Sequence, residues 1–251
     1  MNNKQVAILA AKKADKIILT NYNKIKKVTK KATNNFVTDV DLAAEKAIIN
    51  TIKKHTNHSI LSEEIGKIDN NSDYRWIIDP IDGTHNYMHG FPIFGVNIAL
   101  EYKKELILGL ITLPTLNQVY IAEKGKGAYL NNKKITVSNI TNLKDALIIG
   151  ASKLYKKSSL NYMKKISKKI FKIRTVECAV FGLAVVAAGN ADAYVMLQTN
   201  PWDVAAGIIL INEAGGKITD LKGNKADQYS KKLVLSNKKL HTKLINITKT
   251  L

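Results

Sequence analysis

Tyr74-Arg75-Trp76-Ile77-Ile78 is an apolar, strand-like run, and Asp79-Pro80-Ile81-Asp82-Gly83-Thr84 follows it directly. These six following residues place two carboxylates, a free carbonyl, a glycine and a hydroxyl within one tight turn. Carboxylate and carbonyl oxygens suit hard cations such as Mg²⁺. A glycine in front of a helix start suits a phosphate group. The combination therefore favours phosphate-ester chemistry on metal ions.

The composition bounds the class of protein. The chain has 251 residues, of which 45% are hydrophobic, so it can bury a substantial core as one large domain or as two small ones packed together. The single Cys178 excludes an internal disulfide and indicates a cytoplasmic location. No apolar run approaches the roughly 20 residues that span a bilayer. The N-terminal residues lack a signal-peptide pattern, so we expect no membrane partner.

The net charge of +19 has two interpretations. It favours either a nucleic-acid or membrane partner or a surface covered with solvated lysines. The lysines occur as scattered pairs such as Lys12-Lys13 and Lys164-Lys165, without interleaved aromatic residues or a recognised nucleic-acid motif. We favour the solvated surface, and a positive field would still attract an anionic phosphate ester.

Hydrophobic periodicity predicts the elements of the first half. Apolar residues at helical spacing predict a first helix over about residues 3–27. Thr38 and Asp41 are placed as a capping box, so a second helix is expected to start there. An antiparallel meander is expected from Phe94 to Val137. The strands expected in this half lie at 59–63, 74–78, around 96–100, 105–113 and 118–123.

The second half alternates strands with helices. We expect strands at 147–150, 172–176, 191–197, 217–220 and 233–235, and helices at 158–170, 179–188, 204–214 and the C-terminus. The pattern predicts a division into two parts. Residues 1–143 would form an α+β half with the antiparallel sheet and most metal ligands, and residues 144–251 an α/β half that completes the site.

Several acidic residues lie at positions where α/β proteins commonly place their functional sites. Glu63-Glu64, Asp79, Asp82 and Asp203 each lie at the end of a predicted strand or the start of a predicted helix. Asp82 and Asp203 would also serve as helix N-caps, and Glu63-Glu64 as solvated surface. Taken together, the metal-binding interpretation is favoured, because an unpaired carboxylate embedded in apolar sequence is costly.

These motifs resemble the paired signatures of the inositol monophosphatase family, in its bacterial branch. The resemblance rests on 79–84 with Glu63-Glu64 upstream and Trp202-Asp203 downstream, and it extends to Asn35–Asp41. It implies an α/β (α+β) fold built as a layered α/β/α/β/α sandwich. It also implies a homodimeric, cytoplasmic, Mg²⁺-dependent enzyme that hydrolyses a small phosphate monoester with a metal-activated water.

The resemblance also implies the metal ligands. One Mg²⁺ would be held by Glu63, Asp79 and the carbonyl of Ile81. A second would be held by Asp79, Asp82 and Asp203, with Asp79 bridging. Some members of the family bind a third ion near Glu63, so two ions are expected, with a third as an alternative.

Further roles follow from the same resemblance. Asp82 and the backbone N–H groups of Gly83 and Thr84 would lie against the phosphate. Thr84 would help Glu63 deprotonate the attacking water. The remaining two roles belong to Asp41, which would support Thr84 from behind, and to Lys30, at the position of a family lysine near the phosphate.

The residues that would contact the substrate depart from the family. Met196 stands where many members have a glutamate that binds an inositol hydroxyl, and we interpret it as a core residue. Glu177 replaces a glycine, with Cys178 beside it. Either Glu177 points into the pocket and binds a hydroxyl, or the pocket is remodelled. The substrate is therefore expected to be inositol-1-phosphate or a similar polyol or sugar phosphate.

A binding protein is the alternative function. Some bacterial members of this family bind the transcription machinery, and the charge of +19 is compatible with RNA or a transcription factor as a partner. In that case the phosphatase activity would be weak or secondary. The intact carboxylates favour the enzyme, because a pure binding module has little reason to keep a costly anionic cluster.

Overall fold

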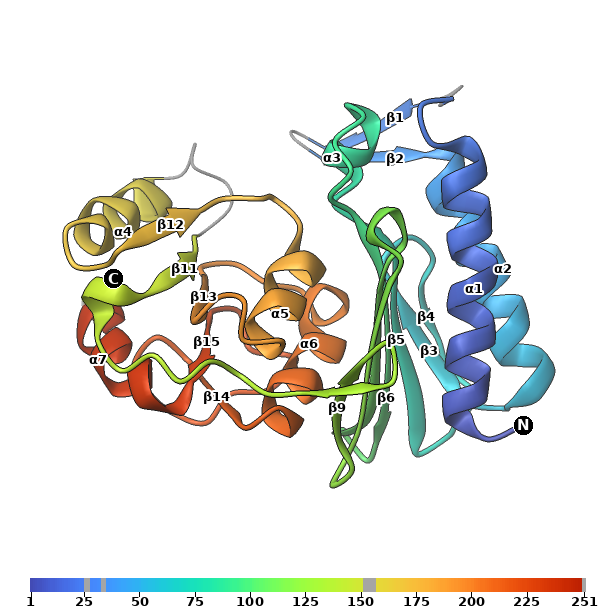
Figure 1. Cartoon of the computed structure of the whole chain (residues 1–251). Coiled ribbons are helices and arrows are strands. Elements are labelled where there is room, and N and C mark those ends of the chain that lie inside the picture. Colours follow the sequence, from blue (N-terminus) through green and yellow to red (C-terminus); the bar gives the residue numbers. More distant parts are fainter. Residues whose placement is uncertain (25–27, 33–34, 151–156, 250–251) are drawn as a thin grey trace.

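The computed structural model describes residues 1–24, 28–32, 35–150 and 157–249 (Figure 1). Within these residues, layers of helices alternate with two β-sheets, which confirms the predicted α/β/α/β/α sandwich. The helical layers are α1 (Asn3–Asn21) with α2 (Asp39–His55), α5 (Ala179–Ala187) with α6 (Pro201–Glu213), and α4 (Lys157–Ser167) with α7 (Lys238–Thr248). The short helices are α3 (Thr84–Met88), η1 (Pro114–Leu116) and η2 (Leu143–Asp145). None of the described helices is long and apolar enough to cross a membrane.

The larger sheet contains the predicted meander. Its strand order is β10-β9-β8-β7-β6-β5-β3-β4, and only β3 and β5 run parallel among its neighbouring pairs. Its strands are β3 (Ser59–Ser62), β4 (Gly66–Ile68), β5 (Tyr74–Asp82), β6 (Gly95–Tyr102), β7 (Glu105–Leu113), β8 (Gln118–Glu123), β9 (Gly127–Leu130) and β10 (Lys133–Ile135). A separate hairpin pairs β1 (Val28–Ala32) with β2 (Asn35–Thr38).

The helices α1 and α2 cover one face of this sheet. The predicted capping box starts α2, where the hydroxyl of Thr38 accepts from the N–H of Asp41 and the Asp41 carboxylate accepts from the N–H of Thr38. Fully buried side chains such as Val6, Ile48 and Trp76 fill the space between the helices and the sheet. This packing places Asp41 of α2 beside the C-terminal end of β5.

The helices α5 and α6 cover the other face and separate it from the smaller sheet. That sheet has the order β12-β11-β13-β15-β14. Its strands are β11 (Leu147–Ile149), β12 (Lys172–Arg174), β13 (Ala193–Met196), β14 (Gly216–Thr219) and β15 (Leu233–Asn237). One core joins both sheets through this middle layer, with Ile111 and Leu210 among its buried residues. The division at 143/144 stays a prediction.

The structure differs from the sequence-based expectations in four respects. The first helix ends at Asn21 instead of continuing to residue 27. The β1–β2 hairpin was not expected, because its lysine- and asparagine-rich sequence shows no apolar alternation. The motif at 79–84 is not a turn after a strand, since β5 continues through Asp82. The short strands β4, β9 and β10 were also missed.

Candidate active site

The end of β5 is irregular where the acidic residues stand. Asp79 pairs with Asn97 on β6, and Asp82 pairs with Gly95, so the register shifts between the two acids. Such an irregularity re-aims side chains that a regular strand would alternate. Asp79 is 2% exposed, and its Oδ1 accepts a hydrogen bond from the N–H of Ile81 at 3.0 Å. The bulge therefore presents both carboxylates at one end of the sheet.

Gly83 lets the chain turn from β5 into α3. Its φ of +85° is in the left-handed region that favours glycine. A Cβ atom there would lie 2.9 Å from the carbonyl oxygen of Ile93 and 3.2 Å from the Cβ of Cys178. Both the conformation and the space thus require glycine, and the backbone N–H groups of Gly83 and Thr84 begin the five-residue helix α3.

Thr84 links the motif to α2. Its Oγ1 lies 3.2 Å from Oδ1 of Asp41 and 2.9 Å from the carbonyl oxygen of Ile81, so its one proton can be donated to either. Asp41 is 1% exposed, and burial raises its pKa to about 6 despite hydrogen bonds from Thr38. The contact between Asp41 and Thr84 that the resemblance implied is therefore present.

Asp82 contacts the start of α5. Its Oδ2 accepts from the backbone N–H of Val180 at 2.6 Å and from the thiol of Cys178 at 3.3 Å. Burial, followed by the nearby charge of Asp203, raises the pKa of Asp82 to about 7. Burial and Asp82 together raise the pKa of the Cys178 thiol, so the thiol keeps its proton and donates it. Cys178 therefore holds Asp82 and is no thiolate nucleophile.

Acids from three separate segments converge on Asp79. Burial, followed by the charges of Glu63, Asp82 and Asp203, raises the pKa of Asp79 well above its ordinary value. Glu63 follows β3, and its backbone N–H donates to the carbonyl of Ile78 on β5 at 3.2 Å. Asp203 lies in the first turn of α6, where its Oδ2 accepts from the N–H of Asn200 at 2.8 Å. Glu63, Asp82 and Asp203 are thus each close enough to Asp79 to repel its charge.

The acids are gathered but not preassembled around one point. Across the part of the chain that the structure describes, no group of three His, Cys, Asp or Glu side chains is already arranged as a metal site. Carboxylates of like charge repel one another when no cation lies between them. Asp79, Asp82 and Asp203 each direct one oxygen to a backbone N–H. A donor set of one buried and three partly buried carboxylates of like charge fits a divalent cation, which would offset their repulsion.

The residues expected to contact the substrate lie in different surroundings. Met196 is 5% exposed in the core beneath α5 and α6, which confirms its interpretation as a core residue. Cys178 is buried, whereas Glu177 is exposed, with a φ of +46° that is unusual for a residue with a side chain. The backbone of Lys30 lies in β1, but its side chain is outside the described residues.

Sequence reasoning missed the residue that holds the turn carrying Glu63. Glu45 of α2 is 2% exposed, and its Oε1 accepts from the backbone N–H groups of Glu64 at 3.1 Å and Ile65 at 3.2 Å. The hydroxyl of Ser62 donates to the same oxygen. The available signal was the spacing, because Glu45 follows Asp41 by four residues and so shares a face of α2.

Comparison with known proteins assigns the family. The sequence profile of the inositol monophosphatase family matches residues 3–251. The chain therefore belongs to the inositol monophosphatase family, whose members are metal-dependent phosphatases.

Curated relatives match nearly the whole chain. An inositol monophosphatase of Dictyostelium discoideum is 37% identical over 252 residues, covering 96% of this chain and 92% of its own. A fructose-1,6-bisphosphatase/inositol-1-monophosphatase of Thermotoga maritima is 33% identical over 249 residues, with 98% and 96% covered. The Nus factor SuhB of Vibrio cholerae is 36% identical over 244 residues, with 92% and 90% covered. Relatives named as phosphatases and a relative named as a Nus factor thus have similar sequence identity to this chain.

Solved structures share the fold. The extragenic suppressor protein suhB of Bartonella henselae has a TM-score of 0.94 and 32% identity, covering 98% of each chain. An inositol monophosphatase/NADP phosphatase in complex with Mg²⁺ and phosphate has a TM-score of 0.84 and 25% identity, covering 94% of this chain and 90% of its own. The layered fold described above is therefore that of the family.

Proposed function

We propose that the protein is a Mg²⁺-dependent phosphatase of small phosphate monoesters, with inositol-1-phosphate or a similar polyol or sugar phosphate as substrate. The observation that carries the proposal is the convergence of Glu63, Asp82 and Asp203 on the buried Asp79, whose pKa is raised by burial and then by these charges. Such repulsion is costly in a folded protein unless a cation offsets it. A relative of the same fold binds Mg²⁺ and phosphate, which supports the choice of ion.

The chain offers a ligand set for two ions. Glu63, Asp79 and the carbonyl of Ile81 would hold one Mg²⁺, and Asp79, Asp82 and Asp203 the second. Ile81 is buried, and its carbonyl oxygen already accepts the hydroxyl of Thr84, so binding would exchange one partner for another. When bound, Mg²⁺ would neutralise phosphate charge and lower the pKa of a bound water.

The other residues of the motif would position the phosphate and the water. The N–H groups of Gly83 and Thr84, with Asp82 beside them, would lie against the phosphate at the start of α3. Thr84 would orient the attacking water, and Glu63 would accept its proton. Asp41 contacts the Thr84 hydroxyl at 3.2 Å, so it would hold that hydroxyl in its orientation. Lys30 would add positive charge near the phosphate.

The residues that replace the usual substrate contacts of the family support a class of substrate. Met196 is buried in the core, so it would offer no hydroxyl contact. Glu177 is exposed and Cys178 contacts Asp82, so of the two Glu177 is available to accept from a substrate hydroxyl. This supports a hydroxylated phosphate ester, without selecting inositol over a sugar.

A phosphate-release panel tests the proposal. Inositol phosphates, sugar phosphates and nucleotide 3′-phosphates would be supplied with Mg²⁺, and released phosphate measured. We expect release from at least one polyol or sugar monophosphate and its loss in EDTA. No release from any member by a folded protein would overturn the proposal.

A second candidate function is binding to RNA or to a transcription factor. The net charge of +19 and the relatives named Nus factor SuhB favour it. Counterion release predicts that RNA affinity falls steeply as the salt concentration rises. Fluorescence anisotropy with a labelled RNA at several salt concentrations would test this, and affinity that is absent or independent of salt would exclude the RNA partner.

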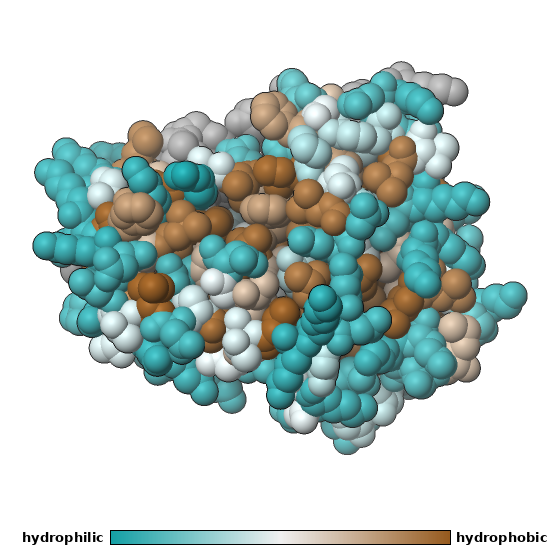
Figure 2. Space-filling model, viewed as in Figure 1, coloured by the Kyte–Doolittle hydropathy of each residue, from teal (hydrophilic) through white to brown (hydrophobic). Residues whose placement is uncertain are grey.

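A homodimer in the cytoplasm completes the proposal. Figure 2 shows hydrophobic side chains gathered across the centre of one face, over the region of α5 and α6. Phe181 and Val185 of α5 are only partly buried. An exposed apolar area of this kind supports association between copies. Light scattering would give the mass in solution, and a monomer at all concentrations would contradict the dimer.

The single Cys178 supports the cytoplasmic location, which cell fractionation would test.

A further inference from the structure

Asn97 is a buried amide in the middle of the larger sheet. It is 0% exposed on β6, and its register partner on β5 is Asp79. Directly opposed residues in an antiparallel pair point to the same face, so both side chains lie on the face that α6 covers. A buried amide needs hydrogen-bond partners, and Asn97 finds both of them on α6.

The two contacts of Asn97 lie on either side of Asp203 in the sequence of α6. Its Nδ2 donates to the carbonyl oxygen of Trp202 at 2.5 Å, and its Oδ1 accepts from the backbone N–H of Ala206 at 3.3 Å. These groups are four residues apart, so they are the two that an α-helix joins by its own hydrogen bond. The amide of Asn97 therefore lies against the first turn of α6, and Asp203 lies within that turn.

The helix α6 packs closely against the larger sheet. At Gly109 of β7 the helix approaches so closely that a Cβ would lie 2.8 Å from the carbonyl oxygen of Ala206. That contact sets how near α6 lies to the sheet. Directional contacts orient the helix at both ends. At its C-terminal end Glu213 accepts from the N–H groups of Gly125 and Gly127, and at its N-terminal end the Asn97 amide makes one contact on each side of Asp203.

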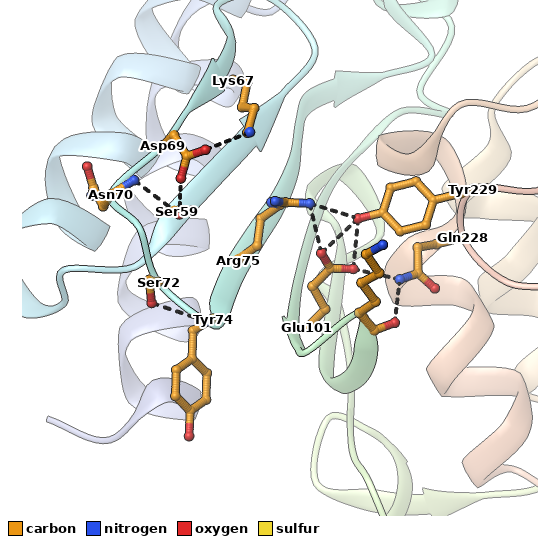
Figure 3. Close-up of polar contacts among 11 residues, drawn as sticks. Ser59, Lys67, Asp69, Asn70, Ser72, Tyr74, Arg75, Glu101, Gln228 and Tyr229 are labelled. Carbon is orange, nitrogen blue, oxygen red and sulfur yellow. Dashed lines mark hydrogen bonds and ion pairs between the residues drawn. The ribbon is translucent and has the colours of Figure 1, made fainter.

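A second polar contact on the same strand lies at the other end of the sheet. Glu101 lies four residues further along β6, where it accepts from Gln228 at 2.6 Å and Tyr229 at 2.7 Å (Figure 3). The sheet is thus joined to the segment that carries these two residues at the end away from Asp79. The contact made by Asn97 is at the acidic end, so its local effect falls on Asp203.

We propose that Asn97 is a positioning residue that sets where Asp203 stands relative to Asp79 and thereby determines the affinity of the acids for a divalent cation. The inference rests on Asp203 belonging to the ligand set proposed above. A neutral amide suits this place, because it pairs with one acceptor and one donor of the helix without adding negative charge beside Asp79. An aliphatic side chain would remove both contacts.

Cation binding without substrate tests the inference. The dissociation constant for Mn²⁺, taken from the electron paramagnetic resonance signal of the free ion, would be compared for wild type and Asn97→Leu. We expect it to rise by about 10- to 100-fold, as is typical when a group that orients a metal ligand is removed. Asn97→Ser keeps a hydroxyl for one of the two contacts, so it is expected to show a smaller rise and serves if Asn97→Leu does not fold.

Thr112→Val is the matched control. Thr112 is buried on β7, and its hydroxyl lies 2.7 Å from Oδ1 of Asp15 on α1, so it ties the same sheet to a helix on the opposite face. Unfolding by urea in EDTA would give the stability of each variant. We expect Thr112→Val to lose stability but keep the Mn²⁺ affinity of the wild type. An equal loss of affinity in this control would overturn the inference, because the effect would then follow general destabilisation.

A double-substitution cycle separates this inference from the proposal on which it rests. Asp203→Asn alone should weaken Mn²⁺ binding, and adding Asn97→Leu should change it no further, within about twofold, because Asn97 acts through Asp203. If the double variant raised the Mn²⁺ dissociation constant by the product of the two single effects, the positioning role would be overturned. Wild-type affinity in Asn97→Leu beside weak binding in Asp203→Asn would overturn only this inference. Wild-type affinity in Asp203→Asn would instead remove Asp203 from the proposed ligands and the inference with it.

Discussion

The two ends of β5 and β6 bury carboxylates in opposite ways. At the start of β5, Arg75 lies 3.2 Å from Glu101, which also accepts from Tyr229 and Gln228 (Figure 3). Glu101 is 2% exposed, and a cation and neutral donors surround it. At the other end, Asp79 is equally buried, but the groups that most perturb it are other acids.

The difference separates a structural carboxylate from a functional one. A cation and two neutral donors satisfy the Glu101 carboxylate and join the larger sheet to the segment that carries Gln228 and Tyr229. Crowding by acids makes the Asp79 end unfavourable until a positive charge arrives. The same strands therefore carry a fixed contact at one end and a proposed binding site at the other.

The largest expected effect comes from Asp82→Asn. Loss of a ligand charge should reduce phosphate release by about 100- to 1,000-fold. The pKa of Asp82 is raised to about 7, so its stabilising protonated form is lost as the pH rises through 7. At pH 8 in EDTA the asparagine variant should therefore resist urea better than wild type. If Asp82→Asn lost both activity and stability, Asp82 would be a structural acid like Glu101.

A buried histidine gives a pH test. His241 of α7 lies 2.7 Å from the hydroxyl of Ser236 and 2.9 Å from that of Thr219, and burial, followed by the nearby positive charge of Lys217, lowers its pKa to about 4. Its neutral form is favoured on folding, so the stability is complete above pH 6.5 and is lost as the pH falls toward 4. At 1.36 kcal/mol per pH unit the loss approaches about 3 kcal/mol.

Urea unfolding at several pH values would measure this loss. His241→Gln should flatten the profile over that range, whereas the exposed His89→Gln should leave it unchanged. A profile that is the same for wild type and His241→Gln would contradict the assignment.

Glu101→Gln should destabilise the protein without disabling the site. Removing the charge leaves Arg75 without its buried partner, and because Arg75 is partly exposed we expect a cost of about 2 kcal/mol in the free energy of unfolding. Glu105→Gln, in an exposed pair with Lys124, is the matched control and should change little. A fall in the phosphate-release rate of folded Glu101→Gln as large as in Asp82→Asn would erase the distinction between the two ends.

The smallest expected effect concerns Glu177. Its φ of +46° is in the left-handed region, so Glu177→Gly should stabilise the protein by about 0.5–1 kcal/mol, and Glu177→Ala should not. A rise in the Michaelis constant for the substrate in both variants would support a substrate contact. Lower stability in Glu177→Gly than in Glu177→Ala would mean that the backbone there is not strained.

Local features of the site could be predicted from the sequence. The capping box of Thr38 and Asp41 depends on residues three apart, and the structure confirms it. The apolar alternation around β6, β7 and β8 fixed the meander. Met196 could be assigned to the core because its neighbours are apolar. The roles of the individual acids as ligands stay predictions.

Long-range contacts could not be predicted. The amide of Asn97 contacts residues more than 100 positions away, and no local pattern marks it. Glu101 likewise contacts a residue that is distant in the sequence, Tyr229. The strand was expected to end at Ile78, before the motif, whereas β5 continues to Asp82 with a register shift between Asp79 and Asp82 that accommodates Pro80.

The central claim is that the acids around Asp79 form a site for divalent cations. Thermal unfolding of the metal-free protein at pH 7.5 with increasing Mg²⁺ tests it most directly, because a ligand of the native state raises the melting temperature. We predict that the melting temperature rises with Mg²⁺ in wild type and in Glu101→Gln, but not in Asp79→Asn. A wild-type melting temperature that is independent of Mg²⁺, or an equal rise in Asp79→Asn, would contradict the claim.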